Sequence, residues 1–482
     1  MTYLLSLLAV LLLASPLNAS SRSISFPQAL KIAFENNLDI KIADLDKDFG
    51  KTFVHTAESV YDTTFTALTD WKDDRDKPVS ALLSGPQNKT ANVNVGLTKK
   101  LWLSGTTLDL QFKNVYKETT ATSSTNPLYW DPRLELNITQ PILKNFLGLN
   151  DRRNLKIGYL KEKIKNLSAE QKISTTLASV AKLYWEFSAA QETVEIKQQA
   201  LEHAQKLYQA NQKKIKLGTI EETDLLASHA NVLARENDLL EAQNHWQLIH
   251  EKFKNALQEK SPMILTPKDA LSFEEEKFEK NTALKKAFQA RKDFLIAKED
   301  IESKNLDLKV SRNALYPQID LVGTIASNGL NKHYNDALSD INSFDYPTYY
   351  AGVSVKFPLG NNAAQSTYLQ SRAEKLNALY TFQKLEQEIT LDIDQKIRTL
   401  STEAEKAKTS GKIKKLLKQK MFQEEKKFNQ GRSSINFVIQ FQEDYLNSAT
   451  QHIQSLLEYQ KTVIDFRKSE GTLLGYYLKA IL

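Results

Sequence analysis

Hydrophobic residues return at every second position in four short stretches of the chain. Two of these stretches, DTTFTALTDW and PQIDLVGTIA, directly follow Tyr61 and Tyr316. The other two, ELNITQPIL at 135–143 and GVSVKFPLG at 352–360, each carry a proline near their end. Such alternation is typical of β-strands with one apolar and one polar face. The pattern therefore predicts two pairs of strands.

Two long stretches instead carry a hydrophobic residue at every seventh position, which is typical of a coiled-coil seam. The first seam comprises Ile173, Val180, Phe187, Val194, Leu201, Tyr208 and Ile215, and resumes with Leu225, Val232, Leu239, Trp246 and Phe253. The second comprises Ile393, Leu400, Ala407, Met421 and Phe428, is interrupted at Lys414, and resumes with Val438, Tyr445, His452, Tyr459 and Phe466.

A glycine divides each seam, Gly218 in the first and Gly431 in the second. Glycine commonly ends a helix because it adopts the left-handed conformation without strain. Each seam therefore predicts a long helix, a tight turn and a long return helix. At 1.5 Å per residue, the helix expected over 152–216 is about 100 Å long.

The chain is a duplicated unit, since ALKIAF at 29–34 returns as ALKKAF at 283–288 and the two tip glycines are 213 residues apart. Extra residues in the first copy, near 84–120, alternate in two runs and predict an additional hairpin. The expected division is: signal peptide 1–19; first-repeat helix 20–60; strands 61–143, including that hairpin; long hairpin 144–257; linker 258–282; second-repeat helix 283–315; strands 316–360; long hairpin and C-terminus 361–482.

Composition narrows the function classes. The 482 residues contain no Cys, which excludes disulfides, Cys-ligated metals and thiol catalysis. The net charge of +6 comes from interspersed Lys and Glu, so nucleic acid is not the expected partner. The apolar run LLSLLAVLLLA at 4–14 has the length of a signal peptide. We therefore expect an exported protein.

If the exported chain crosses a membrane, it must do so as a closed β-barrel, since no later run is apolar enough for a membrane helix. Four strands, or six with the extra hairpin, are too few to close a barrel, so neighbouring copies would have to complete it. Aromatic residues flank the strands as a membrane interface would require: Tyr129, Trp130, Phe344, Tyr346, Tyr349 and Tyr350.

This arrangement resembles the TolC-like outer membrane efflux proteins over essentially the whole mature chain. The duplicated order of elements carries the resemblance, with the strand end Thr139-Gln140-Pro141 and the tips LGTIEETDLL at 217–226 and QGRSSINFVI at 430–439. It implies an α+β fold in which a homotrimer shares a β-barrel in outer membrane lipid and a helical tunnel in the periplasm. It also implies a passive channel for efflux or type I secretion, coupled to an inner-membrane transporter through a periplasmic adaptor.

The resemblance points to two sets of residues at the tips. Members with acidic rings at the tunnel entrance carry Asp six positions after the tip glycine, and in the second repeat also nine after. Asp224 matches this pattern, whereas Phe437 and Gln440 depart from it. Asp224 could equally be a first-turn acid that interacts with the helix dipole. The candidates for adaptor docking are Gly218, Thr219, Gly431, Arg432 and Ser433.

An enzyme is not expected, because no catalytic, cofactor-binding or metal-binding constellation stands out. His245 and His250 are five apart on a helix, and Ser179 with Lys182 forms a Ser-x-x-Lys pattern without companion motifs. Two alternatives to the channel remain: a periplasmic coiled-coil scaffold or adaptor without a barrel, and an outer membrane barrel enzyme.

Overall fold

The computed structural model describes residues 21–216, 220–276 and 278–481, so the expected signal peptide and the tip residues Gly218 and Thr219 lie outside the described residues. The chain divides into two compact units. We call Asp46–Asn166 with Ile296–Gln383 the sheet unit, and Met1–Leu45, Leu167–Leu295 and Lys384–Leu482 the helical unit.

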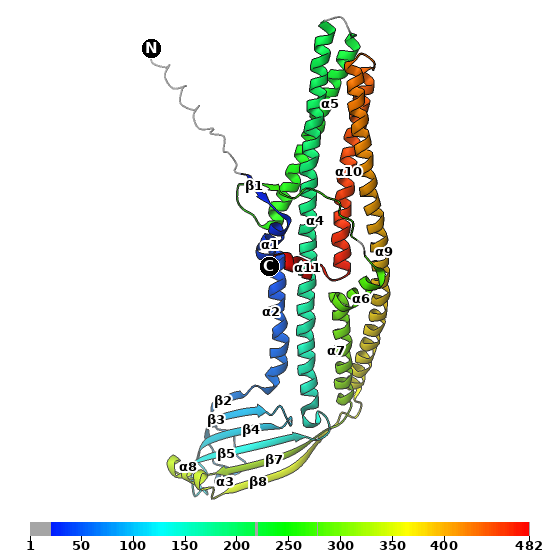
Figure 1. Ribbon diagram of the computed structural model, residues 1–482. Helices are drawn as coiled ribbons and strands as arrows, with labels where there is room; N and C mark the ends of the chain where they lie inside the picture. The colour runs from blue at the N-terminus through cyan, green and yellow to red at the C-terminus, as the bar shows by residue number, and fades with distance from the viewer. Residues whose placement is uncertain (1–20, 217–219, 277, 482) are drawn as a thin grey trace, which may run out of the picture. The chain divides into compact units, whose positions relative to one another are not determined.

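The sheet unit is built on one antiparallel sheet in the order β2-β3-β4-β5-β7-β8 (Figure 1). Its strands are β2 (Thr64–Asp74), β3 (Asn88–Lys100), β4 (Thr107–Thr119), β5 (Leu128–Pro141), β7 (Gln318–Asn328) and β8 (Pro347–Lys356). The hairpin β3–β4 falls in the segment where the sequence indicates an extra pair of strands. It lies between β2 and β5, and its turn places Gly105 at a φ of +67°.

Short helical segments join these strands: η1 (Ser59–Tyr61), α3 (Ala81–Ser84), η2 (Phe146–Gly148) and α8 (Tyr334–Ser343). The sequence analysis did not predict α8, which buries Ala337 and Ile341 in the connection between β7 and β8. A Cβ atom at Gly329 would lie 1.9 Å from the Ala337 carbonyl oxygen, so glycine is needed for this close approach.

Long helices leave the sheet from both repeats: α2 (Leu38–Glu58), α4 (Leu149–Lys216), α7 (Lys292–Ala314) and α9 (Asn362–Asn429). Inside the sheet unit, Ile157 and Leu160 of α4 bury against Leu306 of α7. On its other side, α4 approaches α2 closely at Gly158, where a Cβ atom would lie 2.9 Å from the Phe53 carbonyl oxygen. The missing side chain at Gly158 thus permits the close approach of α4 and α2.

The helical unit contains α4 from Leu167 and α9 from Lys384, together with the return helices α5 (Glu222–Leu257) and α10 (Ile435–Ser469). Both outgoing helices, α4 and α9, have 68 residues and start 213 residues apart. Both return helices start at that same offset. The coiled-coil prediction is confirmed, since Ile173, Val180, Phe187, Ile393 and Leu400 are all buried.

Aromatic side chains dominate the core of the first hairpin. Phe187 of α4 is fully buried and stacks on Phe253 of α5, with ring centres 5.2 Å apart. His250 lies in the same cluster, where its Nε2 accepts a hydrogen bond from the backbone N–H of Leu265. Burial, followed by the nearby Lys254 charge, lowers the pKa of His250.

The remaining segments pack around the hairpins: β1 (Ser21–Ile24), α1 (Phe26–Asn36), β6 (Ile264–Pro267), α6 (Lys280–Ala290) and α11 (Leu473–Ile481). In the linker, β6 pairs in parallel with β1. The Asp269 carboxylate accepts hydrogen bonds from the Phe26 backbone N–H and from the Tyr184 hydroxyl, at 2.7 Å each. It thereby satisfies a free N–H group at the start of α1.

The duplicated motif is visible in the fold. ALKIAF lies on α1 and ALKKAF on α6, and the alanines at equivalent positions, Ala29 with Ala283 and Ala33 with Ala287, are buried in both. The two tandem repeats and the α+β class are therefore confirmed. Every helix in the described part of the chain is too polar or too short to cross a lipid bilayer.

Candidate functional site

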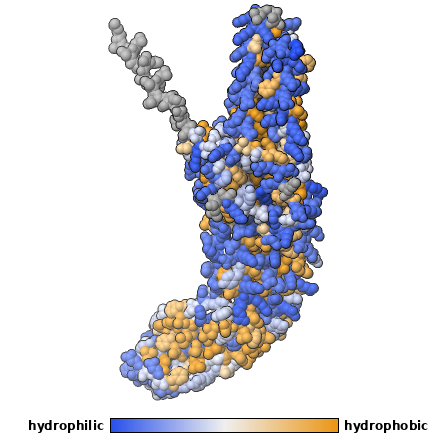
Figure 2. Space-filling model, in the orientation of Figure 1, coloured by the Kyte–Doolittle hydropathy of each residue, from blue (hydrophilic) through white to orange (hydrophobic). Residues whose placement is uncertain are grey.

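One face of the six-stranded sheet is apolar across its whole width. The strand register aligns its side chains in transverse rows, because residues that pair across strands share a face. From β2 to β8 this face carries Phe65, Ala67, Val93, Val95, Leu97, Leu108, Leu110, Phe112, Leu134, Leu136, Ile138, Leu321, Ile325, Val353 and Val355. Many of them are exposed, and Figure 2 shows hydrophobic residues gathered over the strands.

The opposite face is polar. It carries Asn92 and Thr98 on β3, Asp109 and Lys113 on β4, and Glu135 on β5. These side chains bond across the strands: the Thr98 hydroxyl donates to Asp109 at 2.9 Å, and the Lys113 ammonium lies 3.2 Å from Glu135. Hydrogen-bonding groups of this kind suit contact with water, whereas the other face suits contact with lipid.

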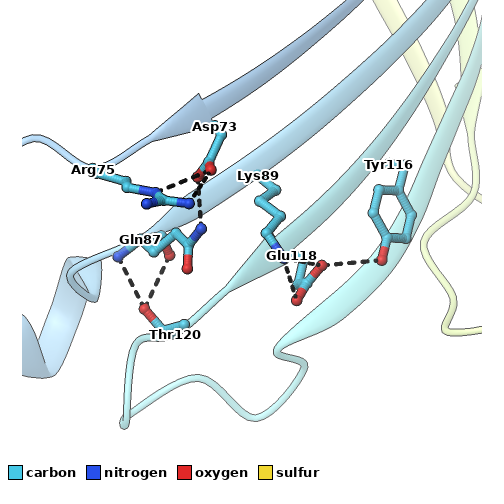
Figure 3. Close-up of polar contacts among 7 residues, drawn as sticks. All are labelled: Asp73, Arg75, Gln87, Lys89, Tyr116, Glu118 and Thr120. Carbon is cyan, nitrogen blue, oxygen red and sulfur yellow. Dashed lines mark hydrogen bonds and ion pairs between the residues drawn. The ribbon is translucent and has the colours of Figure 1, made fainter.

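An aromatic row and then a charged row end the apolar face. Trp71, Tyr116 and Trp130 share one transverse row, and Asp73, Lys89 and Glu118 form the next. Lys89 lies 3.4 Å from Glu118, while Asp73 pairs with Arg75 and accepts a hydrogen bond from Gln87 (Figure 3). Thr120 closes the same end by bonding to the Gln87 backbone (Figure 3). This succession of apolar, aromatic and charged rows is typical of a membrane-water interface.

The aromatic residues expected to flank the strands do not all lie on this face. Strand alternation places Trp130 and Tyr349 on the apolar face and their neighbours Tyr129 and Tyr350 on the polar face. The sequence analysis missed Trp71, Tyr116 and the charged row, since their alignment depends on strand register. Alternation along β3 and β4 indicates which of their residues share a face, but it does not give the register that aligns the rows.

The tip of the second hairpin is a compact turn. Gly431 has a φ of +72°, and the Arg432 backbone N–H donates to the Lys427 carbonyl at 2.9 Å, so the last turn of α9 is capped. The Ser433 hydroxyl donates to Glu424 at 2.6 Å. This hydrogen bond, followed by that from Lys427, lowers the pKa of Glu424. The Arg432 and Ser434 side chains remain exposed beside it.

The three entrance candidates lie in the first turns of α5 and α10. Asp224 and Phe437 occupy equivalent positions, 213 residues apart. Asp224 is half-buried, whereas Phe437 is 57% exposed and stacks on Phe441, with ring centres 6.2 Å apart. Gln440 is exposed and donates a hydrogen bond to Asp444. The structure thus places these candidates at corresponding ends of the two hairpins.

The sequence analysis also missed an exposed leucine stripe on α5, formed by Leu226, Leu233 and Leu240 at intervals of seven. Its seven-residue spacing was a usable signal, but it runs one position beyond the predicted seam. As for metal sites, no group of three or more His, Asp or Glu side chains in the described ranges could hold an ion.

Comparison with known proteins agrees with this geometry. The family model described as outer membrane efflux protein matches residues 94–257, from β3 to the end of α5. No curated protein matches the chain. Solved structures of outer membrane channels share the fold. The outer membrane channel CmeC of Campylobacter jejuni is 14% identical, with 94% of this chain and 88% of that chain covered and a TM-score of 0.69.

The open-state MtrE outer membrane channel of Neisseria gonorrhoeae is 13% identical, with 93% of this chain and 89% of that chain covered and a TM-score of 0.69. The outer membrane protein VceC of Vibrio cholerae is 12% identical, with 92% and 96% covered and a TM-score of 0.66. The matched segment and the shared fold together confirm the resemblance of this chain to the TolC-like outer membrane efflux proteins.

Proposed function

We propose that this chain is one subunit of an outer membrane channel that extends into the periplasm. The channel conducts substrates passively from an inner-membrane transporter and its periplasmic adaptor to the outside. One observation carries this proposal: a six-stranded sheet that is apolar and exposed on one face, hydrogen-bonded and polar on the other, and bounded at one end by an aromatic row and a charged row. The family match supports it.

The sheet requires further copies of the chain. Within the described residues, β2 and β8 each pair with one neighbour only, so the sheet has two open edges. Lipid does not tolerate unpaired backbone groups, and closed membrane barrels have about eight strands or more. A single sheet of six is too small to close. We infer that three copies close it together, as the family resemblance implies.

Internal repetition indicates how the helices of neighbouring copies meet. In the second repeat, Ile439, Leu446 and Ile453 of α10 pack inside the chain. Ile439 joins a cluster with Leu207 of α4, and Ile453 joins one with Ala189. The equivalent residues of the first repeat are the exposed stripe on α5, each 213 residues earlier. That stripe has the sequence of a packing surface but lacks a covering helix among the described segments.

The surface to receive this stripe lies on α9. The α4 residues Ala200 and His203 line the cavity beside Leu446, and their equivalents on α9 are Ile413 and Leu416, which are exposed. An open groove of about 640 Å³ runs between α9 and α10 there. The α5 stripe of one copy would therefore pack against α9 of the next, repeating the contact already present inside the chain. Such head-to-tail contacts form a closed ring when the rotation between successive copies closes, as three copies would require here.

The hairpin tips supply the two remaining roles. Arg432 and Ser433, beside Gly431, would receive a helical hairpin of the adaptor, together with Gly218 and Thr219. Asp224, Phe437 and Gln440 would form rings at the tunnel entrance. Three copies would then present three exposed Phe437 rings, which could narrow the entrance and expel water from it. Asp224 would add negative charge.

A soluble periplasmic scaffold fits the sheet less well. Such a protein would expose to water the whole apolar face from Phe65 on β2 to Val355 on β8. Contiguous apolar surface of that extent marks an interaction site and promotes aggregation when it is left uncovered. A soluble scaffold would leave this apolar face uncovered, whereas membrane lipid would cover it.

The decisive experiment measures solubility, mass and conductance of the full chain. We expect extraction only with detergent, a mass of three chains, and single channels in planar lipid bilayers. A protein that stays monomeric in detergent-free buffer and produces no channels would contradict the proposal and favour the scaffold. Export of a dye from cells that carry the matching transporter and adaptor then tests coupling.

A further inference from the structure

We propose that the hairpin β3–β4 is part of the channel wall, so that three copies close a barrel of eighteen strands with a correspondingly wide pore. This inference rests on the proposed trimeric channel, and it concerns the pore that this particular chain builds. Six strands per copy, counted in the order β2-β3-β4-β5-β7-β8, are its starting point.

The register shows that the hairpin is inserted into the sheet over its full length. β2 pairs with β3 from Thr64↔Thr98 to Asp74↔Asn88. β4 pairs with β5 from Thr107↔Thr139 to Glu118↔Leu128. Every residue of β2 therefore pairs with the hairpin, and the hairpin separates β2 from β5 in the sheet. Removing β3 and β4 from the wall would break both of these ladders.

Both faces of the sheet continue through the hairpin without a change of polarity. On the apolar face, Val95 lies between Ala67 and Phe112. On the polar face, the Asn92 side chain bonds to Asp70 at 2.6 Å, and Lys113 pairs with Glu135. A hairpin outside the barrel would meet one environment on both faces, and its sequence would have no reason to alternate in step with β2 and β5.

The strand count is compatible with ring closure. Neighbouring strands are antiparallel throughout, so with an even number of strands the two edges, β2 and β8, run in opposite directions. β2 of one copy can therefore pair antiparallel with β8 of the next. The two edges have similar lengths, 11 and 10 residues. Each of the three β2–β8 junctions between copies would then continue the antiparallel pairing found within the chain.

The consequence is a wide, polar pore. Barrel diameter grows roughly linearly with strand number, and barrels of about 16–18 strands leave an aqueous channel. Six strands per copy in place of four would widen the barrel about 1.5-fold. The hairpin would line the added wall with Thr98, Asp109, Gln111 and Lys113. The pore would accordingly admit larger solutes than a barrel without it.

Cross-linking tests the strand order in the intact trimer. The chain contains no Cys, so any disulfide that forms must join two engineered cysteines. Thr66→Cys on β2 is combined with Tyr350→Cys, Gly352→Cys or Ser354→Cys on β8, all on the polar face. We expect one of these pairs to give a covalent trimer on oxidation. The control pair Thr66→Cys with Asn137→Cys should not react, because the hairpin holds β2 and β5 about 14 Å apart.

Pore size tests the same inference independently. In planar bilayers, polyethylene glycols of increasing size added on the barrel side report the widest polymer that enters. A variant lacking Pro86–Ala121 should remain a trimer and admit polymers of roughly 1.5-fold smaller radius. An unchanged size limit, or reaction of the Thr66–Asn137 pair in the full chain, would overturn the inference.

The outcomes separate the two proposals. A full-length protein that is no membrane trimer contradicts the channel itself. A membrane trimer whose β2 and β5 cross-link, or whose strands number twelve by electron microscopy, contradicts only the eighteen-stranded barrel. If the shortened variant fails to fold, the cross-links and the strand count in the full chain still distinguish a barrel of eighteen strands from one of twelve.

Discussion

Leu233 and Leu446 occupy the same position in the two repeats, yet Leu446 is 3% exposed and Leu233 is 54% exposed. Leu446 lies on α10, which packs within the chain, and Leu233 lies on α5, whose corresponding face is uncovered. Equivalent sequence positions therefore meet different surroundings in an isolated chain. The difference is removed if a neighbouring copy supplies the missing helix.

Replacing Leu233 should weaken assembly without weakening the subunit. We expect Leu233→Asp to prevent trimer formation, because a charge would face an apolar partner surface, while the secondary structure of the chain stays intact. Light scattering in detergent measures the mass, and circular dichroism measures the helix content. A normal trimer would show that the α5 stripe does not lie between copies.

Leu446→Ala is the matched comparison. It removes a buried side chain at the equivalent position and should lower the free energy of unfolding of the chain by about 2–5 kcal/mol. If both substitutions affected only assembly, or both only folding, the two leucines would have the same surroundings after all.

Phe187 should be essential for the stability of the helical unit. Phe187→Asp places a carboxylate among Phe253, Trp246 and His250, and we expect a loss of several kcal/mol in the free energy of unfolding. Chemical denaturation of the detergent-solubilised protein checks this. Gln198, which is exposed on the same helix, provides the control, and Gln198→Asp should change the stability little.

Arginine should destabilise the protein on one face of β8 and be tolerated on the other. Val353 is 62% exposed on the apolar face, and Ser354 follows it on the polar face. Val353→Arg should cost up to about 2–4 kcal/mol of stability in the membrane, since it places a charge in lipid. Ser354→Arg should be tolerated and should shift ion selectivity. Refolding into lipid vesicles measures both; equal effects would show that the two faces share one environment.

Phe437 and Asp224 should control different properties of the entrance. Phe437→Ala should raise the conductance in planar bilayers because it removes an apolar constriction, whereas Asp224→Asn should reduce the preference for cations. Phe422, exposed on α9, serves as the control, and Phe422→Ala should leave the conductance unchanged. No change with Phe437→Ala would exclude a hydrophobic gate at this position.

Acidification should destabilise the helical unit. Burial, followed by Lys414, lowers the pKa of His452, whose Nδ1 lies 2.9 Å from the Ser410 hydroxyl, and burial also lowers that of His250. The unfolded chain binds protons below about pH 6.5, where the folded chain resists them, so stability falls as the pH drops through that value. The melting temperature should therefore be lower at pH 5.5 than at pH 7.5.

The double variant His250→Gln, His452→Gln tests the origin of this effect. Glutamine is neutral at both pH values, so the fall in melting temperature should become smaller. An equal fall in the variant would assign the pH dependence to other groups.

The repeating features of the fold were accessible from sequence because they depend on local periodicity. Seven-residue spacing identified Phe187 and Phe466 as core residues, and the glycine at 431 marked the end of α9. A strand pattern of period two likewise indicated the hairpin around Gly105. These patterns depend only on residues that are close together in the sequence, so they can be recognised without knowing which distant segments are in contact.

Features that depend on register or on distant segments were not accessible. The row of Trp71, Tyr116 and Trp130 exists only once the four strands from β2 to β5 are aligned. Helix α8 is short and polar, and it is held by contacts with β5 and β7 rather than by a strong pattern of its own. The entrance candidates came from a family pattern that this sequence follows at Asp224 and leaves at Phe437.

Because α4 and α9 have equal lengths, an evolutionary change in the length of one helix requires the same change in the other. A single heptad inserted into α4 alone would move every later contact on that helix by about 10.5 Å along its axis. The Arg235–Glu443 ion pair and the Phe187–Phe253 stack could not both follow such a shift. Tolerated insertions should therefore gather in the connections between strands, where the first repeat already differs from the second.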